Sequence, residues 1–486
     1  MKLTDLIEGL EIVRYSGNLN IEISKIVYDS RKAVKDCVFV AIEGYKTDGH
    51  NYVSQAISNG AKVVILQKDI NISENVVKIL VKDTRCSLAR ISSNFYKNPS
   101  TKLELIGITG TNGKTTTTYL IKSIMEKSGK NVGVIGTIGN MINGKVIKAK
   151  NTTPESLDLQ EFFNSMVEEN VESCVMEVSS HSLELKRVEY CDFNVGIFTN
   201  LTPEHLDFHK DLQSYMEAKV KLFYKTRDFN IINIDDEYGR RIKDTIQEFE
   251  TPILTYGIES KADITAHNIE FYASGVKFDL ITPSGNIDIR FNIPGKFSVY
   301  NALAAAACGI AYNIKLEDIK KGLEAVRGVD GRFEVVPTKT DYSVIIDYAH
   351  TPDGFKKVLS TIDQFAKGRK IIVFGCGGDR DKTKRPKMGE IASHYCDICI
   401  ITNDNPRTEN PIEIINDIIK GINNEECEYV VIEDRREAIR YALEIAKKDD
   451  VILLAGKGHE TYQIIGNKVL PFDEKKIVLE LLGEEE

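Results

Sequence analysis

The stretch Leu103-Glu-Leu-Ile-Gly-Ile-Thr-Gly-Thr-Asn-Gly-Lys-Thr-Thr-Thr-Thr-Tyr-Leu120 decides the interpretation of this chain. Its first residues are mostly apolar and predict a buried strand. A glycine-containing turn follows at residues 110–113, and Lys114 and Thr115 open a predicted helix. Such a turn binds phosphate through backbone N–H groups and the helix N-terminus, and it adds a lysine charge and a hydroxyl for Mg²⁺. We therefore predict nucleotide phosphate binding by Gly110, Thr111, Asn112, Gly113, Lys114, Thr115 and Thr116.

The match to the usual P-loop pattern is incomplete, because Ile108 stands where that pattern has its first glycine. The alternative is an ordinary strand-to-helix turn that carries a lysine. Threonine and glycine have low helix propensity, so four threonines and two glycines would not be expected at a helix start that serves stability alone. Their presence favours phosphate binding.

Length and composition restrict the class of protein. A chain of 486 residues predicts about three domains, and 42% apolar residues suffice for globular cores. A net charge of −9 with no long basic stretch argues against a nucleic-acid partner. No apolar run reaches the ~18 residues of a membrane span. Nine scattered cysteines, together with an N-terminus unlike a signal peptide, predict a cytoplasmic protein with reduced thiols.

Alternating strand and helix patterns predict an α/β fold with domains over residues 1–100, 101–330 and 331–486. In the middle domain this alternation indicates a parallel sheet. Ligands gather at the carboxyl ends of parallel strands, so polar residues after strands are candidate site residues. The main predicted strands cover residues 37–42, 61–66, 103–108, 132–135, 174–178, 195–198, 231–234, 370–374, 398–402 and 451–455.

Polar residues occupy four such places in the middle domain. Asn151-Thr-Thr-Pro154 precedes a helix, Glu177 lies in an apolar strand, His205 follows a strand, and Lys219 lies on a helix. A buried carboxylate such as Glu177 needs a partner, and a cation is the simplest one. A carboxylate and an imidazole near a triphosphate are candidate Mg²⁺ ligands.

Simpler interpretations of these residues stay open. A zinc pair or a structural loop is the alternative for His205 and His209, although no cysteine lies close by in the sequence. For Lys219 the alternative is a lysine on the helix surface, and spacing alone favours it. Asn301 either caps the alanine-rich helix that follows it or hydrogen-bonds a base.

Two motifs of the last domain are weak signals. Gly375-Cys-Gly-Gly378 follows a strand as in a dinucleotide site, but a charged loop follows where that fold would start a helix. Cys396 and Cys399 form a CxxC pair inside a predicted strand, which disfavours redox or zinc chemistry. The charged strand ends at residues 403–407 and 456–460 suit a zwitterionic ligand.

Taken together, these motifs resemble the Mur ligase family of peptidoglycan synthesis. The resemblance covers essentially the whole chain, in family order. The resemblance rests on the following residues: Gly110-Thr-Asn-Gly-Lys-Thr-Thr116, Glu177-Val-Ser-Ser-His181, His205-Leu-Asp207, Glu217-Ala-Lys219, Asn301, Gly331-Arg332, Asp347-Tyr-Ala-His350, Asp404-Asn-Pro-Arg407 and Gly456-Lys-Gly-His-Glu460.

The resemblance implies an ATP-dependent, Mg²⁺-requiring amide ligase that acts through an acyl phosphate. The expected substrates are UDP-N-acetylmuramoyl-L-alanyl-D-glutamate and meso-2,6-diaminopimelate. The three domains would bind the UDP end, ATP and the incoming amino acid in turn, the last domain being Rossmann-like. A monomer is expected.

The resemblance also assigns expected roles to residues. Lys114, His205 and Lys219 would be catalytic, and Mg²⁺ would bind Thr115, Glu177, His205 and a carbamylated Lys219. Asn301 would contact adenine, Arg332 the phosphates and Asp347 the ribose. Leu185 departs from relatives that carry glutamine there. The expected substrate contacts are Ser30, the loop Tyr45–Thr47, Asn151, Thr152, Thr153, Ser179 and Arg187 for the UDP-linked dipeptide, and Arg380, Asp404, Asn405, Pro406, Arg407, Gly456 and Glu460 for the amino acid.

The choice of amino acid depends on Arg407 and Arg380. Diaminopimelate differs from L-lysine by a second carboxylate, and an arginine fork binds a carboxylate bidentately. Three alternatives remain open at this point: a ligase that uses L-lysine, a ligase similar to folylpolyglutamate synthase, and a P-loop switch that only hydrolyses nucleotide.

Overall fold

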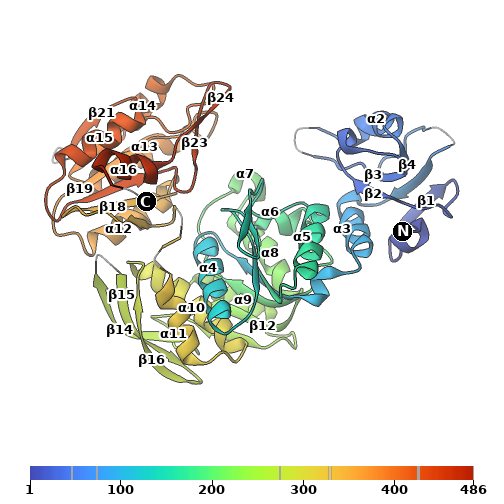
Figure 1. The fold of residues 1–486 in the computed structure, drawn as a ribbon, viewed down its shortest axis with the longest axis horizontal. Coiled ribbons are helices and arrows are strands. Elements are labelled where there is room, and N and C mark those ends of the chain that lie inside the picture. Colours follow the sequence, from blue (N-terminus) through green and yellow to red (C-terminus); the bar gives the residue numbers. More distant parts are fainter. Residues whose placement is uncertain are drawn as a thin grey trace. The chain divides into compact units, whose positions relative to one another are not determined.

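Figure 1 shows the fold of the chain in the computed structural model. The chain divides into two compact units. The first is Met1–Asp263 with Ala304–Lys315, and the second is Ile264–Leu303 with Leu316–Glu486. Both contain parallel sheets covered by helices, which confirms the predicted α/β class. The structure describes residues 1–44, 47–72, 75–272, 275–326, 328–329, 331–423 and 427–484, with the backbone alone for Leu206 and Asp207. Tyr45 and Lys46 of the expected uridine loop lie outside the described residues.

A five-stranded sheet in the order β1-β5-β4-β3-β2 begins the first unit, and only β1 is antiparallel to its neighbour. The inner strands are apolar on both faces because helices cover both. The elements are α1 (Leu3–Leu6), β1 (Ile12–Ser16), β2 (Lys25–Val27), η1 (Ser30–Lys32), β3 (Cys37–Val40), η2 (Gly49–Tyr52), α2 (Val53–Ser58), β4 (Ala61–Leu66), β5 (Val77–Val81), α3 (Thr84–Phe95) and η3 (Pro99–Lys102).

An eight-stranded sheet in the order β13-β12-β11-β6-β10-β7-β8-β9 forms the rest of the first unit. Strand β6 lies between β10 and β11, with Ile108 opposite Glu177 and Thr109 opposite Phe198. The segments that follow these strands therefore emerge at one edge. The elements are β6 (Glu104–Thr109), α4 (Lys114–Lys127), β7 (Val132–Ile135), β8 (Asn140–Ile142), β9 (Lys145–Ile147), α5 (Ser156–Glu168), β10 (Ser173–Glu177), α6 (Ser180–Glu184), β11 (Phe193–Phe198), α7 (Leu206–His209), α8 (Leu212–Phe223), β12 (Thr226–Asn233), α9 (Glu237–Ile246) and β13 (Ile253–Tyr256).

An antiparallel sheet opens the second unit, built from β14 (Thr265–Tyr272), β15 (Gly275–Thr282) and β16 (Gly285–Phe291). Helices α10 (Lys296–Ala311) and α11 (Leu316–Ala325) follow, and residues 304–311 of α10 belong to the first unit. The prediction that Asn301 could cap the alanine-rich helix is wrong, because α10 already begins at Lys296, directly after the turn at Gly295 (φ +94°). Asn301 lies in the helix interior, where it is buried.

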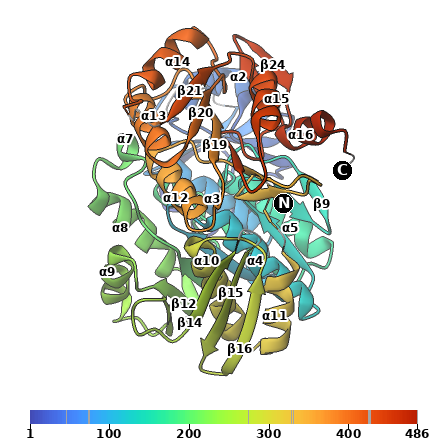
Figure 2. The same ribbon diagram turned by 90° about the vertical axis from the view of Figure 1, so that its left-hand side faces the viewer.

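The C-terminal sheet has the order β17-β18-β22-β19-β20-β21, and only β17 is antiparallel. Figure 2 shows α12, α13 and α14 on one side of it and α15 and α16 on the other. The elements are β17 (Glu334–Val336), β18 (Ser343–Asp347), α12 (Pro352–Asp363), β19 (Lys370–Phe374), α13 (Lys384–Tyr395), β20 (Ile398–Ile401), α14 (Pro411–Ile419), β21 (Glu428–Val431), α15 (Arg435–Ile445), β22 (Val451–Ala455), β23 (Tyr462–Ile465), β24 (Lys468–Pro471) and α16 (Glu474–Leu482).

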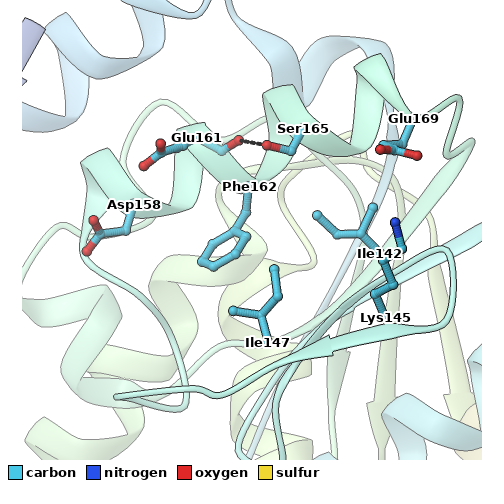
Figure 3. Close-up of a pocket in the computed structure, with 8 residues that line it drawn as sticks. All are labelled: Ile142, Lys145, Ile147, Asp158, Glu161, Phe162, Ser165 and Glu169. Carbon is cyan, nitrogen blue, oxygen red and sulfur yellow. Dashed lines mark hydrogen bonds between the residues drawn. The ribbon is translucent and has the colours of Figure 1, made fainter.

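A surface pocket lies between α5 and the hairpin of β8 and β9 (Figure 3). Its apolar lining comes from Ile142, Ile147 and Phe162, and carboxylates and Lys145 stand around it. None of the predicted site residues lines this pocket. In the described part of the chain, no helix has the length and apolar content needed to cross a membrane.

Close packing of α13 on α14 depends on Gly389, where a Cβ would lie 2.2 Å from the carbonyl oxygen of Ile418. We expect Gly389→Ala to lower the free energy of unfolding by about 1–3 kcal/mol, since the helices must separate to admit the methyl group. Urea unfolding followed by circular dichroism measures the effect. Gly354→Ala in α12 is the matched control, because its nearest neighbour would lie 3.2 Å away. Equal losses in the two variants would contradict this account.

Candidate active site

The predicted phosphate turn has a backbone that requires glycine. Gly110 has φ +148°, and a Cβ there would lie 1.9 Å from Thr199 Oγ1. Gly113 has φ +86° and provides no side-chain cap for α4. The first N–H groups of α4 have no partner within the helix itself, and such a helix N-terminus favours an anion.

The end of β11 holds this turn in place. Asn200 accepts hydrogen bonds from the Thr111 N–H through its backbone oxygen (2.8 Å) and from the Asn112 N–H through Oδ1 (3.0 Å). The hydroxyl of Thr199 donates to the Asn112 carbonyl at 2.7 Å. Asn200 was not predicted as a site residue, and its only sequence signal is its place directly after a strand.

Lys114 contacts the carbonyls of the turn, and Glu177 contacts Thr115. The Lys114 ammonium donates to the carbonyl oxygens of Gly110 (2.9 Å) and Thr111 (2.8 Å). Glu177 is 1% exposed and accepts a hydrogen bond from the Thr115 hydroxyl at 3.0 Å. It also accepts from the N–H (2.8 Å) and hydroxyl (3.1 Å) of Thr137. Neutral donors therefore stabilise this buried carboxylate, and Thr137 is a further residue that the sequence analysis missed.

Lys219 is buried, which excludes the alternative of a lysine on the helix surface. Its side chain is on the inward face of α8, and Nζ lies 4.4 Å from the centre of the Tyr215 ring. Burial lowers the pKa of Lys219 well below its ordinary value, and the charge of Lys114 lowers it further. Helical spacing alone did not reveal this, because spacing does not identify a buried polar position, whereas the family resemblance assigned Lys219 to the site.

Three histidines gather beside Lys219. The His205 ring lies 4.8 Å from His181, and His209 lies 4.9 Å from Tyr215. His209 is buried, shares a hydrogen bond with Ser180 Oγ at 2.9 Å, and has a pKa lowered by burial and by Lys219. His205 has φ +57° and a side chain that is 46% exposed.

The described residues contain no group of three or more His, Cys, Asp or Glu side chains that could hold a metal. The zinc alternatives at His205 with His209 and at Cys396 with Cys399 therefore receive no support. Cys396 and Cys399 are buried free thiols.

Several predicted dipeptide contacts meet at the end of β10. The Thr153 hydroxyl donates to the Glu177 carbonyl at 2.9 Å and accepts from the Ser179 N–H at 3.1 Å. Arg187 donates to the Thr153 carbonyl at 3.1 Å, and the Thr152 and Thr137 hydroxyls are 3.1 Å apart. Two other residues predicted to contact the dipeptide substrate have none of these hydrogen bonds. Asn151 is exposed, and the Ser30 hydroxyl donates to Gln55 Oε1 at 2.7 Å.

In the second unit, Arg332, Asp347 and Tyr348 lie close together. The Arg332 guanidinium lies 4.7 Å from the centre of the Tyr348 ring. Asp347 accepts hydrogen bonds from the N–H groups of Phe333 and Ala349, both at 2.7 Å. Burial raises the pKa of Asp347, although Arg332 opposes the shift. His459 lies 5.0 Å from the Tyr348 ring, and burial lowers its pKa to about 4.

Arg380 and Arg407 both lie close to Gly377, in the turn that follows β19. A Cβ at Gly377 would lie 2.9 Å from Arg407 Nη1 and 3.8 Å from Arg380 Cγ. Arg407 has φ +52° and donates to the Gly378 carbonyl at 2.8 Å. Pro406 also packs on Gly378, where a Cβ would lie 1.9 Å from the Pro406 carbonyl oxygen.

A polar network joins the neighbouring strand ends. Asn405 donates to Glu460 Oε2 at 2.8 Å, and the Lys457 ammonium lies 3.3 Å from Asn405 Oδ1 and 3.4 Å from Glu460 Oε2. Gly456 has φ +111°, and a Cβ there would lie 2.9 Å from Asp404 Oδ2. Lys457 is fully buried and was not predicted, although it stands inside the quoted Gly456–Glu460 motif.

Family models match most of the chain. The Mur ligase family catalytic domain matches residues 22–97, the Mur ligase middle domain matches 108–309, and the Mur ligase glutamate ligase domain matches 331–458. A curated relative from Caldanaerobacter subterraneus subsp. tengcongensis, UDP-N-acetylmuramoyl-L-alanyl-D-glutamate--2,6-diaminopimelate ligase, is 53% identical over 486 residues and both chains are fully covered. The chain belongs to the Mur ligase family. It is therefore an ATP-dependent ligase, and the alternative of a nucleotide-hydrolysing switch is wrong.

Further relatives are similar to this chain in sequence or in fold. A relative with the same name from Clostridioides difficile is 50% identical over 484 residues, covering 100% of each chain. A solved structure of an enzyme with that name has 30% identity and a TM-score of 0.74, with 99% of each chain covered. The folylpolyglutamate synthase of Mycobacterium tuberculosis shares the fold alone, at 17% identity, a TM-score of 0.63, and 77% and 91% coverage of this chain and that one.

Burial of Lys219 leads to a stability prediction. The unfolded chain binds this proton more readily than the folded chain, so stability rises with pH as the ordinary lysine pKa is approached. At pH 7 without bicarbonate, we expect Lys219→Met to raise the free energy of unfolding, because folding then no longer buries an amine that must give up its proton. Chemical denaturation at pH 7 and pH 9.5 measures the gain, which should shrink at the higher pH.

Lys221→Met on the same helix is the matched control. Lys221 is half-exposed and pairs with Glu184 at 2.6 Å, so its removal should change stability little at either pH. A Lys219→Met protein that is less stable than wild type at pH 7 would show that the buried amine is not destabilising.

Proposed function

We propose that this Mur ligase adds meso-2,6-diaminopimelate to UDP-N-acetylmuramoyl-L-alanyl-D-glutamate, in cytoplasmic synthesis of peptidoglycan precursors. The two relatives that are 53% and 50% identical over their full lengths carry the name of this reaction. The observation that carries the proposal is that Arg407 and Arg380 both lie close to Gly377, beside the network of Asn405 and Glu460.

The reaction proceeds in two balanced steps. A γ-carboxylate oxygen of D-glutamate attacks the γ-phosphorus of ATP, and the bond to ADP breaks, giving an acyl phosphate. The neutral amine of diaminopimelate then attacks the acyl carbon, phosphate leaves, and the amine loses one proton as the amide forms. The first step joins two anions, so positioning and charge neutralisation carry most of the catalysis.

The turn at residues 110–116 binds the ATP phosphates in this proposal. Its support is the helix N-terminus behind Gly113 and the ammonium of Lys114, which already lies over the turn carbonyls. Lys114 moves from those carbonyls to the phosphate oxygens, where it meets developing negative charge. Asn301 contacts adenine, Arg332 the phosphates and Asp347 the ribose.

Thr115 and Glu177 are suited to Mg²⁺. Both offer oxygen, and their side chains lie 3.0 Å apart. Mg²⁺ at phosphotransfer sites takes one or two protein carboxylates and fills its other positions with phosphate and water. A small protein ligand set is thus sufficient, with His205 and a carbamylated Lys219 completing it. When bound, the ion neutralises phosphate charge and polarises the γ-phosphoryl group.

The environment of Lys219 supports its carbamylation. Only a neutral amine attacks CO₂, and burial favours the neutral form of Lys219. The nitrogen–carbon bond forms with loss of one proton, and the side chain becomes an anion.

The remaining residues divide by substrate. Ser30, Asn151, Thr152, Thr153, Ser179 and Arg187 hold the UDP-linked dipeptide. Asp404, Asn405, Pro406, Gly456 and Glu460 hold the diaminopimelate, with Glu460 facing an ammonium. The protein works as a monomer of three domains, residues 1–100, 101–330 and 331–486.

Phosphate release tests the proposed reaction. We expect release with ATP and UDP-N-acetylmuramoyl-L-alanyl-D-glutamate to require meso-diaminopimelate, and to be weak with L-lysine, since L-lysine lacks the second carboxylate for the arginines. Equal rates with both amino acids would refute the choice of substrate. Release without any amino acid or dipeptide would refute the ligase reaction.

Arg407→Ala tests the specificity residue. We expect the KM for diaminopimelate to rise about tenfold to a hundredfold, from the ~1.5–3 kcal/mol of a charge-assisted hydrogen bond, with the weak L-lysine reaction unchanged. Arg440→Ala, at an exposed pair with Glu437 on α15, is the control and should behave as wild type. Parallel losses with both amino acids in Arg407→Ala would contradict the proposed role.

Carbon-13 NMR with labelled bicarbonate tests the carbamate directly. Wild type should show one carbamate signal. The carbamate is protected from hydrolysis because the site of Lys219 is buried and water is kept away. Lys219→Ala should lose both the signal and the activity, and added bicarbonate should restore neither. A fully active Lys219→Ala protein would falsify the carbamate role.

A further inference from the structure

A fully buried ion pair lies behind the strand ends of the C-terminal sheet. Arg435 Nε lies 2.8 Å from Glu474 Oε1, and both side chains are 0% exposed. Arg435 is the first residue of α15 and Glu474 the first residue of α16. Neither residue belongs to a motif singled out in the sequence.

The guanidinium of Arg435 joins two segments that carry predicted amino-acid contacts. Nη2 donates to the carbonyl of Ala455 at 2.8 Å, and Nη1 donates to the carbonyl of Asn403 at 3.3 Å. Ala455 ends β22 directly before Gly456, and Asn403 directly precedes Asp404. One side chain therefore sets the spacing between residues 403–407 and 456–460.

Lys457 extends this arrangement toward the ligand side. Its buried ammonium lies near Asn405 Oδ1 and Glu460 Oε2, at 3.3 and 3.4 Å. Burial raises the pKa of Glu474, and the charges of Arg435 and Lys457 oppose that shift. The ion pair and the predicted substrate network are thus electrostatically coupled.

Stability alone does not account for such a pair. An apolar pair of similar volume is often as stable as a buried ion pair, because desolvation offsets the attraction between the charges. Apolar side chains would leave the carbonyls of Asn403 and Ala455 without these donors. The distinctive contribution of the pair is therefore the geometry of the two segments.

We propose that Arg435 and Glu474 are positioning residues that set the affinity for the incoming amino acid by aligning residues 403–407 with residues 456–460. This inference rests on the proposed function for the identity of that amino acid. It assigns neither residue any contact with substrate.

The test compares two apolar replacements. Arg435→Met/Glu474→Leu removes the pair, and Arg369→Met/Asp450→Leu is the matched control. Arg369 and Asp450 form a 2.7 Å ion pair in the same sheet, but they directly precede β19 and β22 and so lie at the opposite strand ends. Arg435→Lys is a second variant, for use if the double variant fails to fold. It keeps the positive charge but loses the guanidinium that donates to both carbonyls.

For the Arg435 variants we expect the KM for diaminopimelate to rise about tenfold or more, with the KM values for ATP and the UDP-linked dipeptide within about twofold of wild type. The control pair should leave all three KM values near wild type. An equal rise in all three KM values, or the same rise in the control, would overturn the inference.

Hydrogen–deuterium exchange gives a readout that needs no substrate. Residues 403–407 and 456–460 should exchange faster in the Arg435 variants and not in the control. If wild type does not use diaminopimelate, the proposed function fails, and faster exchange at these residues still supports positioning. Unchanged exchange together with an unchanged KM in a folded variant would refute positioning while leaving the proposed function intact.

Discussion

The close approach of Gly110 to Thr199 is the constraint on which the first unit depends. Strand β6 lies between β10 and β11, so the turn after β6 must pass between the segments that follow its neighbours. A side chain at residue 110 would collide with the Thr199 hydroxyl. Because the turn passes so close, Asn200 can hold it through backbone and side chain, and Glu177 can reach Thr115. The predicted phosphate turn is thus positioned by sheet topology.

The two units bury charge in different ways. In the first, Glu177 is stabilised by hydroxyl and N–H donors, which leaves its negative charge available to a cation. In the second, Arg435 neutralises Glu474 directly, and Lys457 lies between Asn405 and Glu460. An unneutralised carboxylate suits a metal site, whereas a neutralised pair suits a structural role. The difference supports a chemical role for Glu177 and a positioning role for Glu474.

Much of the fold was predictable because buried parallel strands are continuous apolar runs. β6, β19 and β22 are such runs. Contacts between distant segments were not predictable. Asn200 and Thr137 act on residues that lie 88 and 40 positions away. The spacing of α8 could not distinguish a buried Lys219 from an exposed one, because the residue type itself suggests exposure.

The proposed carbamylation of Lys219 would remove an unfavourable interaction between two positive charges, those of Lys219 and Lys114. As an ammonium, Lys219 would be buried and repelled by Lys114, and both effects lower its pKa. Loss of the proton removes the repulsion and creates the nucleophile that CO₂ requires. A carbamate would then place a negative charge where Lys114 now opposes a positive one, so the same lysine that destabilises the ammonium would stabilise the product. The burial that is unfavourable for an ordinary lysine is therefore the condition that makes this position suitable for the modification.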